Sequence, residues 1–283
     1  MSSEHLLPAE LRALFADSAD GRRLSVPLPP GRLVFPQDDG DRPAFWLSDG
    51  PAPVGAWARL RAEHQQSGLW PLLLDALDDE EEAYRPWGNG EVCPSAMSHP
   101  ADHEPAALLA GWWRDNTEES DDDELTPEER RAVTAPYGDG WPGKAPVPPT
   151  RIDADHAADG LAERVFAGHS TLRLGLVAAK RGADAVTVAG WEGAVNYVGD
   201  TAEISSVLRD WEDRFGARVV GVGFSTLLLS VAAPPTTKEE ALAVAAEHFA
   251  FCPDNVWQGH DPQTLTGYAK RIVKDHSWAF WWD

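Results

Sequence analysis

The chain has 283 residues, of which 43% are hydrophobic and 25% are charged, a composition typical of a soluble globular protein with one large core or two smaller ones. Its formal net charge of −22 repels phosphate backbones and anionic lipid surfaces, so we expect neither a nucleic-acid nor a membrane partner. The chain has two cysteines, no signal-peptide pattern at its start and no long apolar run, which favours a reduced, cytoplasmic protein.

The amino-terminal part, residues 1–77, has the pattern of an α/β unit. Leucines at helical spacing predict a helix from Pro8 to Ala16, and "PAFWLSD" at 43–49 predicts a strand. A helix is expected over 54–68, followed by a short buried strand over 69–77. Because Pro71 lacks a backbone donor, we expect the start of that strand at a sheet edge. Strand, helix and strand in this order predict a βαβ-like arrangement.

Residues 78–150 differ in character from what precedes them. The stretch from Asp115 to Glu129 contains nine acidic and no basic residues, and the stretch 134–150 is rich in proline and glycine. A short helix is expected within "AALLAGWWRDN". We interpret 78–150 as an acidic insertion or linker, with a domain boundary near residue 150.

Residues 151–283 have the more regular pattern. A strand pair is expected over 169–180 and 184–191, and two further strands flank Ser225. The intervening helix begins at Asp200, which forms a predicted capping box with Glu203, and it ends at Gly216. Later helices are expected from a Thr237–Glu240 capping box onward and over 261–273. The fold class is therefore predicted as α+β, a mixed and largely antiparallel sheet covered on one face by helices.

The last six residues, "WAFWWD", place four aromatic side chains in a segment that is usually polar. Strand alternation puts Trp278, Phe280 and Trp282 on one face and Trp281 with Asp283 on the other. Three large rings on one face predict a buried closing strand, and only Trp281 is left as a surface contact.

The carboxy-terminal half resembles a known family. The segments "GWEGAVNY" (190–197), "LRDWEDRFGARVVGVGF" (208–224), "LLLSVAAPPTTKEEALAVAAEHFAFCPDNVWQG" (227–259) and the closing "WAFWWD" are similar, in this order, to the bacterial family DUF4253. The resemblance covers roughly residues 165–283. It implies a domain identity and no activity, because the family is one of unknown function.

Two segments, 191–197 and 251–260, combine amide, carboxylate and indole side chains in expected loops, a combination common in recognition surfaces. We hypothesise that they meet at one end of the sheet and line a ligand pocket. The candidate ligand-binding residues are Trp191, Glu192, Asn196, Tyr197, Asp254, Asn255, Trp257 and Gln258. The alternative is that the polar side chains cap turns while the indoles fill the core.

No motif of known chemistry is convincing. Cys93, His99 and His103 have a spacing that offers a metal three ligands from one loop, yet solvated loop histidines are the simpler interpretation. His248 and Cys252 are one helical turn apart, which fits a core pair better than a nucleophile and its base. The "GVGFST" stretch is followed by an expected strand rather than by the helix a dinucleotide site needs. We expect no metal and no cofactor, and the catalytic residues are unknown.

Three classes of function remain open. An acidic, tryptophan-rich chain is typical of an interaction protein that captures a basic partner, as immunity proteins neutralise toxins. The alternatives are a small-molecule-binding module that uses the pocket between 191–197 and 251–260, and an unrecognised enzyme.

Overall fold

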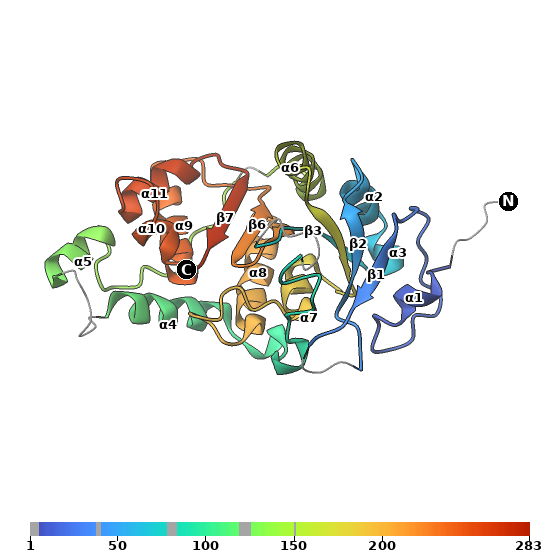
Figure 1. Cartoon of the computed structure of the whole chain (residues 1–283). Coiled ribbons are helices and arrows are strands. Elements are labelled where there is room, and N and C mark those ends of the chain that lie inside the picture. Colours follow the sequence, from blue (N-terminus) through green and yellow to red (C-terminus); the bar gives the residue numbers. More distant parts are fainter. Residues whose placement is uncertain (1–5, 38–40, 78–83, 119–125, 150) are drawn as a thin grey trace.

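The computed structural model describes residues 6–37, 41–77, 84–118, 126–149 and 151–283, and the expected acidic run at 115–129 lies partly outside them. Figure 1 shows the chain as one layered body with a central sheet. The strands are β1 (Gly31–Val34), β2 (Phe45–Pro51), β3 (Trp70–Leu74), β4 (Arg173–Val177), β5 (Arg218–Val222), β6 (Thr226–Ser230) and β7 (Ser277–Trp281). The α-helices are α1 (Ala9–Arg12), α2 (Ala56–Ala62), α3 (His64–Ser67), α4 (Pro105–Thr117), α5 (Pro127–Val133), α6 (Ala154–Gly168), α7 (Ala185–Ala189), α8 (Thr201–Phe215), α9 (Lys238–Phe251), α10 (Asp254–Trp257) and α11 (Leu265–Ile272).

The sheet has the strand order β1-β2-β4-β3-β5-β6-β7. Every neighbouring pair is antiparallel except β3 and β5, which are parallel through the pairs Leu73–Gly221 and Leu74–Val222. The prediction of an α+β fold with a mixed, largely antiparallel sheet is confirmed. β2 and β3 run parallel to each other with β4 between them, so the expected βαβ-like arrangement is present in a split form.

Helices cover both faces of the sheet, not the one face expected. The register pairs Leu73 with Gly221, Gly221 with Leu228 and Leu228 with Ala279, so these residues share a face. Leu73 lies there beside Trp57 of α2 and Phe166 of α6. Phe280, on the opposite face, stacks against Trp211 of α8 at 5.5 Å between ring centroids. Figure 1 accordingly shows α2 and α6 on one side of the sheet and α7 and α8 on the other.

Strands from both sides of residue 150 form this one sheet. β4, from the carboxy-terminal part, lies between β2 and β3, which come from residues 1–77. Trp46 of β2 pairs with Leu176 of β4, and Leu72 of β3 pairs with Gly175. The ladder of main-chain hydrogen bonds therefore does not divide at residue 150.

Several local expectations were wrong. The segment 184–191 forms the short helix α7 rather than a strand, because Ala183, Ala185 and Ala189 pack as a buried helical turn that ends at Gly190 with a positive φ of 71°. β3 is an interior strand, but at its start Trp70 and Pro71 pair only with β4 and have no strand partner on the β5 side. The expectation drawn from Pro71 for the start of this strand is therefore confirmed. Asp200 caps α8 through Ala202 N without the reciprocal Glu203 bond of a capping box.

Two helices have clear start signals that the sequence interpretation did not use. α6 begins after Asp153, whose carboxylate accepts a hydrogen bond from His156 N, and its buried face contains Ala158, Leu161 and Ala162. α5 begins with a complete capping box formed by Thr126 and Glu129. The expected Thr237–Glu240 box at the start of α9 is confirmed.

The closing strand is confirmed as a core element. Trp278, Phe280 and Trp282 are each 1% exposed, whereas Trp281 is 39% exposed. The buried rings pack against α8 and α9, for example Trp278 against Phe215 at 5.3 Å and Phe280 against Phe251 at 4.9 Å. The aromatic residues of β7 therefore join the sheet to the helices on this face.

Candidate functional site

The segments 191–197 and 251–260 meet around the last residues of the chain. The Tyr197 hydroxyl donates to Asp254 Oδ1 at 2.9 Å, and Asn196 Nδ2 donates to the backbone oxygen of Asp283 at 2.9 Å. Gln258 Nε2 lies 3.2 Å from Asp254 Oδ1 and 3.4 Å from Asp283 Oδ2. These polar groups therefore bind one another and the end of β7.

The two indoles of the predicted pocket belong to different aromatic clusters. Trp191 is buried, packs on Trp282 at 5.6 Å and donates from Nε1 to the backbone oxygen of Gly223. Trp257 packs on Phe249 at 5.8 Å. Part of the expected loop 251–260 is the short helix α10, and Glu192 is exposed. Neither of the two cavities described below is lined by these residues, so their ligand-binding role stays a prediction.

The candidate metal ligands are occupied by other contacts. His99 Nδ1 accepts a hydrogen bond from Ala101 N, and His103 Nε2 lies 2.6 Å from Ser98 Oγ. Within the described ranges, no group of three His, Cys, Asp or Glu side chains is placed to hold a metal ion. His248 binds the Tyr268 hydroxyl, while the Cys252 thiol donates to the backbone oxygen of Trp281, so the two do not act on each other.

Ser98, His103 and Asp200 resemble a catalytic triad in composition only. Ser98 Oγ and Asp200 Oδ2 approach the same imidazole nitrogen, Nε2 of His103, at 2.6 and 3.7 Å. In a triad the carboxylate orients the imidazole from the opposite nitrogen. Asp200 also accepts hydrogen bonds from Ser98 N and Ala202 N. The cluster therefore anchors the 3-10 turn at Pro100–Asp102 to the start of α8.

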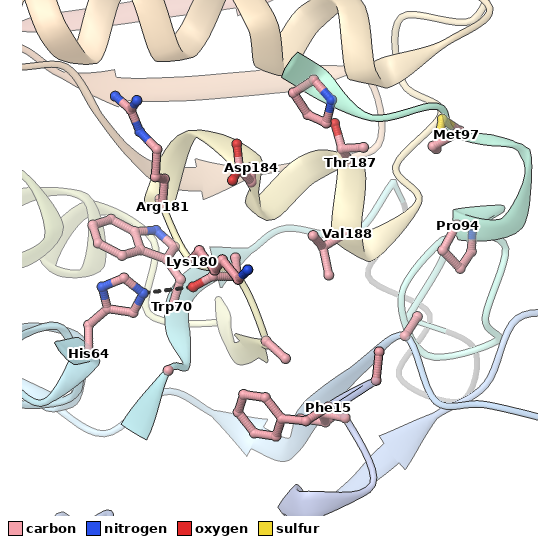
Figure 2. A pocket seen from close by; sticks show the side chains of 18 of the residues that line it. Phe15, His64, Trp70, Pro94, Met97, Lys180, Arg181, Asp184, Thr187 and Val188 are labelled. Atoms are coloured by element: carbon pink, nitrogen blue, oxygen red, sulfur yellow. Dashed lines mark hydrogen bonds between the residues drawn. The ribbon is translucent and has the colours of Figure 1, made fainter. Parts of the chain in front are cut away.

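The larger of the two cavities described here has a volume of about 1080 Å³, and Ser98 and His99 belong to its lining. Its walls come from the loop after α1, the β1–β2 loop, α2, α3 and the 94–100 segment on one side, and from the loop after β4, α7 and α8 on the other. Figure 2 shows Met97 and Pro94 on one side and His64, Trp70 and Arg181 on the other, with Lys180 and Val188 between them. A smaller, mainly apolar cavity of about 550 Å³ lies between α2 and α6.

One wall of the large cavity is a continuous network of ion pairs. Arg61 pairs with Asp155 at 2.9 Å, and Asp155 pairs in turn with Arg218 at 3.3 Å. Arg218 continues to Glu212 at 3.8 Å, and Glu212 to Arg181 at 3.4 Å. The network therefore links α2 and α6 to β5, α8 and the loop after β4. Each of these arginines is already paired with a carboxylate, so none of them contributes a net positive charge to the binding of a ligand.

Three further cations line the cavity without such compensation. Within the part of the chain that the structure describes, no acidic side chain forms an ion pair with Arg22, Arg42 or Lys180. Arg42 Nη2 donates to the backbone oxygen of Leu14 at 3.2 Å, and Arg22 lies 4.1 Å above the centroid of Phe15. An Arg22 guanidinium atom, Nε, is buried and has no hydrogen-bond acceptor among the described residues.

Two glycines make room for the side chains of this cavity. A Cβ on Gly68, whose φ is +71°, would lie 2.1 Å from Arg22 Nη1, and a Cβ on Gly182 would lie 2.5 Å from the Trp70 ring. Trp70 is then held by a hydrogen bond from Nε1 to Val219 O at 3.0 Å. His64 packs edge-on against Trp70 at 5.0 Å and binds the backbone oxygen of Ala179 at 2.8 Å. These side chains are therefore preorganised.

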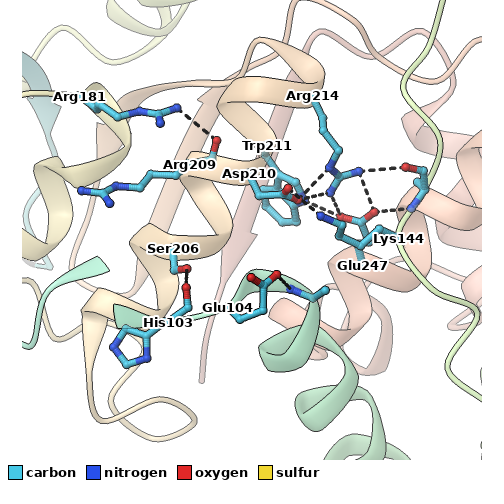
Figure 3. A network of polar contacts seen from close by, with 12 residues as sticks. His103, Glu104, Lys144, Arg181, Ser206, Arg209, Asp210, Trp211, Arg214 and Glu247 are labelled. Carbon is cyan, nitrogen blue, oxygen red and sulfur yellow. Dashed lines mark hydrogen bonds and ion pairs between the residues drawn. The ribbon is translucent and has the colours of Figure 1, made fainter. Parts of the chain in front are cut away.

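The most deeply buried charges belong to the core and not to the cavity. Figure 3 shows Glu247 receiving hydrogen bonds from Arg214 and Trp211, with Asp210 and Lys144 beside them. Glu247 is fully buried and also accepts from Ala145 N at 2.5 Å. This network joins α8, α9 and the 144–145 segment, because Arg214, Trp211 and Ala145 all donate to the Glu247 carboxylate.

The described residues form an α+β fold with one mixed sheet and a cavity that is lined in part by lysine and arginine side chains. Residues 173–283 match the family model of DUF4253, a domain of unknown function, and the match confirms the resemblance seen in the carboxy-terminal half of the sequence. No curated protein and no solved structure is significantly similar to the chain. None of the helices in the described ranges is both long and apolar enough to cross a lipid bilayer.

Proposed function

We propose that the chain is a binding module for a small molecule and that the large cavity is its site. The observation that supports this is a cavity of about 1080 Å³ in which three cations without acidic partners among the described residues face apolar and aromatic groups. Ligand sites typically combine a concave, mainly apolar volume of about 300–1,000 Å³ with a few placed polar groups. The site lies at the junction of the DUF4253 part with the preceding part, not between 191–197 and 251–260.

A cavity-filling substitution tests this proposal. Val188 is half-buried and lines the cavity, so Val188→Trp places an indole where the ligand would lie. Val195→Trp is the matched control, because Val195 is 52% exposed and outside the cavity. A fragment library of neutral, cationic and anionic compounds is screened by NMR, with the Trp70 and His64 resonances as reporters. Hits that survive in Val195→Trp and vanish in Val188→Trp support the site, and hits unaffected by Val188→Trp contradict it.

The charge favours a second function, a cytoplasmic, immunity-like capture of a basic protein. The net charge of −22 would steer a basic partner toward the surface, and Trp281, 39% exposed at the sheet edge, is a candidate anchor. Titration of several purified small basic proteins distinguishes specific capture from general attraction. Specific capture requires one protein to bind well above the others at physiological salt and Trp281→Ala to weaken that binding. Equal binding of all of them contradicts it.

A further inference from the structure

We infer that the ligand of the large cavity is an amphipathic organic anion, a compound with a carboxylate or phosphate group and an apolar part. The inference rests on the proposed function and adds the chemical class of the ligand. It follows from the charge balance of the cavity wall, from the separation of its polar and apolar sides, and from the state of Arg22.

The charge balance favours an anion even though the whole chain is acidic. Seven of the chain's 24 lysine and arginine residues line the cavity. Four of them (Arg61, Arg181, Arg209 and Arg218) are paired with five carboxylates (Asp155, Asp159, Asp184, Glu212 and Asp213). Among the residues that the structure describes, the positive excess therefore comes from Arg22, Arg42 and Lys180, and the exposed Asp17 is the remaining acidic lining residue. Seven cations against six carboxylates among the described residues leave an excess of one positive charge, which a ligand with one negative charge would balance.

The apolar side of the cavity defines the rest of the ligand. Pro94 and Met97 line it away from the His64–Trp70 pair, and Val188 lies between the two sides (Figure 2). Met97 is fixed there because its sulfur accepts a hydrogen bond from Thr201 N at 3.2 Å. A wholly polar ion such as inorganic phosphate would leave this side in contact with water. A compound with an apolar body would instead bury it, which adds free energy of binding in proportion to the area covered.

Among the three cations, Arg22 has a buried hydrogen-bond donor without an acceptor among the described residues. Its guanidinium lies on the Phe15 ring and against Gly68, and its Nε is buried without an acceptor among the described residues. A buried donor left without an acceptor is destabilising, because it has lost its hydrogen bond to water. An anion that approaches this guanidinium lowers that cost by electrostatic attraction, whereas a neutral or cationic ligand does not.

Five probes of similar size or charge test the class of ligand with the full chain. They are benzoate, phenyl phosphate, benzamide, benzylamine and inorganic phosphate, titrated at low salt with the His64 and Lys180 resonances as reporters. We expect benzoate and phenyl phosphate to bind about tenfold more tightly than benzamide, as one charge-assisted contact would give. Benzylamine should bind least, and inorganic phosphate more weakly than phenyl phosphate.

Matched variants show whether the named cations are responsible. Lys180→Gln and Arg42→Gln should each weaken binding of the anions severalfold and leave benzamide unchanged. Lys270→Gln and Arg59→Gln are the controls, since both residues are exposed and outside the cavity, and Arg59, like Arg42, donates to one backbone oxygen. Unchanged anion affinity in Lys180→Gln and Arg42→Gln contradicts the inference.

The outcomes separate this inference from the proposed function. Equal binding of benzamide and benzoate, both sensitive to Val188→Trp, would retain the site and overturn the anionic class. Tighter binding of inorganic phosphate than of phenyl phosphate would overturn the amphipathic part. If the resonances of the cavity residues respond to none of the probes at millimolar concentration and to no compound of the fragment library, both the proposed function and the anionic ligand class are contradicted.

Discussion

Asn255 and Trp281 are joined by a hydrogen bond in which a side-chain amide takes the place of a neighbouring strand. Asn255 Oδ1 accepts from Trp281 N at 3.3 Å, and its Nδ2 donates to Ala279 O at 2.8 Å on the outer edge of β7. Exposed edge groups are a template for pairing with another chain. Asn255, expected to bind a ligand, therefore covers the edge of the sheet.

Replacing Asn255 should open that edge. We expect Asn255→Ala to lower the free energy of unfolding by about 1 kcal/mol, because it removes two hydrogen bonds to the backbone of β7. Urea denaturation measures this loss, and light scattering measures the self-association expected from an open edge. Asn255→Asp keeps an acceptor for Trp281 N and loses the donor to Ala279 O, so it should fall between wild type and Asn255→Ala. A fully stable, monomeric Asn255→Ala protein would show that the edge needs no cover.

The buried Glu247 should be the most sensitive charged position of the core. Glu247→Gln removes the negative charge that Arg214 and Trp211 face at 2.5–3.0 Å. We expect a loss of about 3 kcal/mol in the free energy of unfolding, less than for a wholly unpaired cation because Asp210 still pairs with Arg214 at 2.6 Å. Glu239→Gln, at an exposed position of the same helix, is the control, and equal stability of the two variants would contradict the prediction.

His248 should make the stability depend on pH in a definite direction. Burial, and secondarily the charge of Arg214, lowers the pKa of His248 from 6.5 to about 3. The unfolded chain therefore binds a proton that the folded chain does not. The contribution is complete above pH 6.5 and is lost as the pH falls from 6.5 toward 3, by up to about 1.4 kcal/mol per pH unit.

Unfolding measured across this pH range for wild type and His248→Gln isolates that contribution. The stability advantage of the wild type over His248→Gln should shrink as the pH falls, because glutamine does not titrate. The exposed His260→Gln provides the control and should remain parallel to wild type. A constant difference between wild type and His248→Gln from pH 7 to pH 4 would contradict a neutral, buried imidazole.

Trp278 and Trp281 lie on opposite faces of β7, so we expect their replacement to change the free energy of unfolding by very different amounts. Trp278→Ala should cost about 3–5 kcal/mol, since the indole is 1% exposed and packs on Trp211 and Phe215. Trp281→Ala should stay within about 0.5 kcal/mol of wild type, because the ring is 39% exposed. Thermal unfolding of both variants checks the contrast, and comparable losses would mean that Trp281 is part of the core.

Local sequence patterns predicted the structure correctly where a single local feature, such as strand alternation or a capping box, determines it. Alternation in "WAFWWD" correctly separated Trp281 from Trp278 and Phe280, and the Thr237–Glu240 box correctly marked the start of α9. Such patterns failed at 184–191, where a run of alanine, valine and threonine fits a strand or a buried helical turn equally well. The choice there depended on packing against α8, which no local pattern contains.

The sequence by itself determined the acidic charge, the buried closing strand and the α+β class, because each depends on composition or on short-range periodicity. The resemblance to DUF4253 was also visible in the sequence, because several long segments are similar to that family in the same order. Only the tertiary structure decided that β4 lies between β2 and β3, and that Arg22, Arg42 and Lys180 line one cavity. It also decided that Asn196 binds Asp283 and that Asn255 binds β7, while Tyr197 binds Asp254. The three cations come from three distant segments with no shared motif. Their common location follows from strand order and long-range packing, which spacing along a chain does not encode.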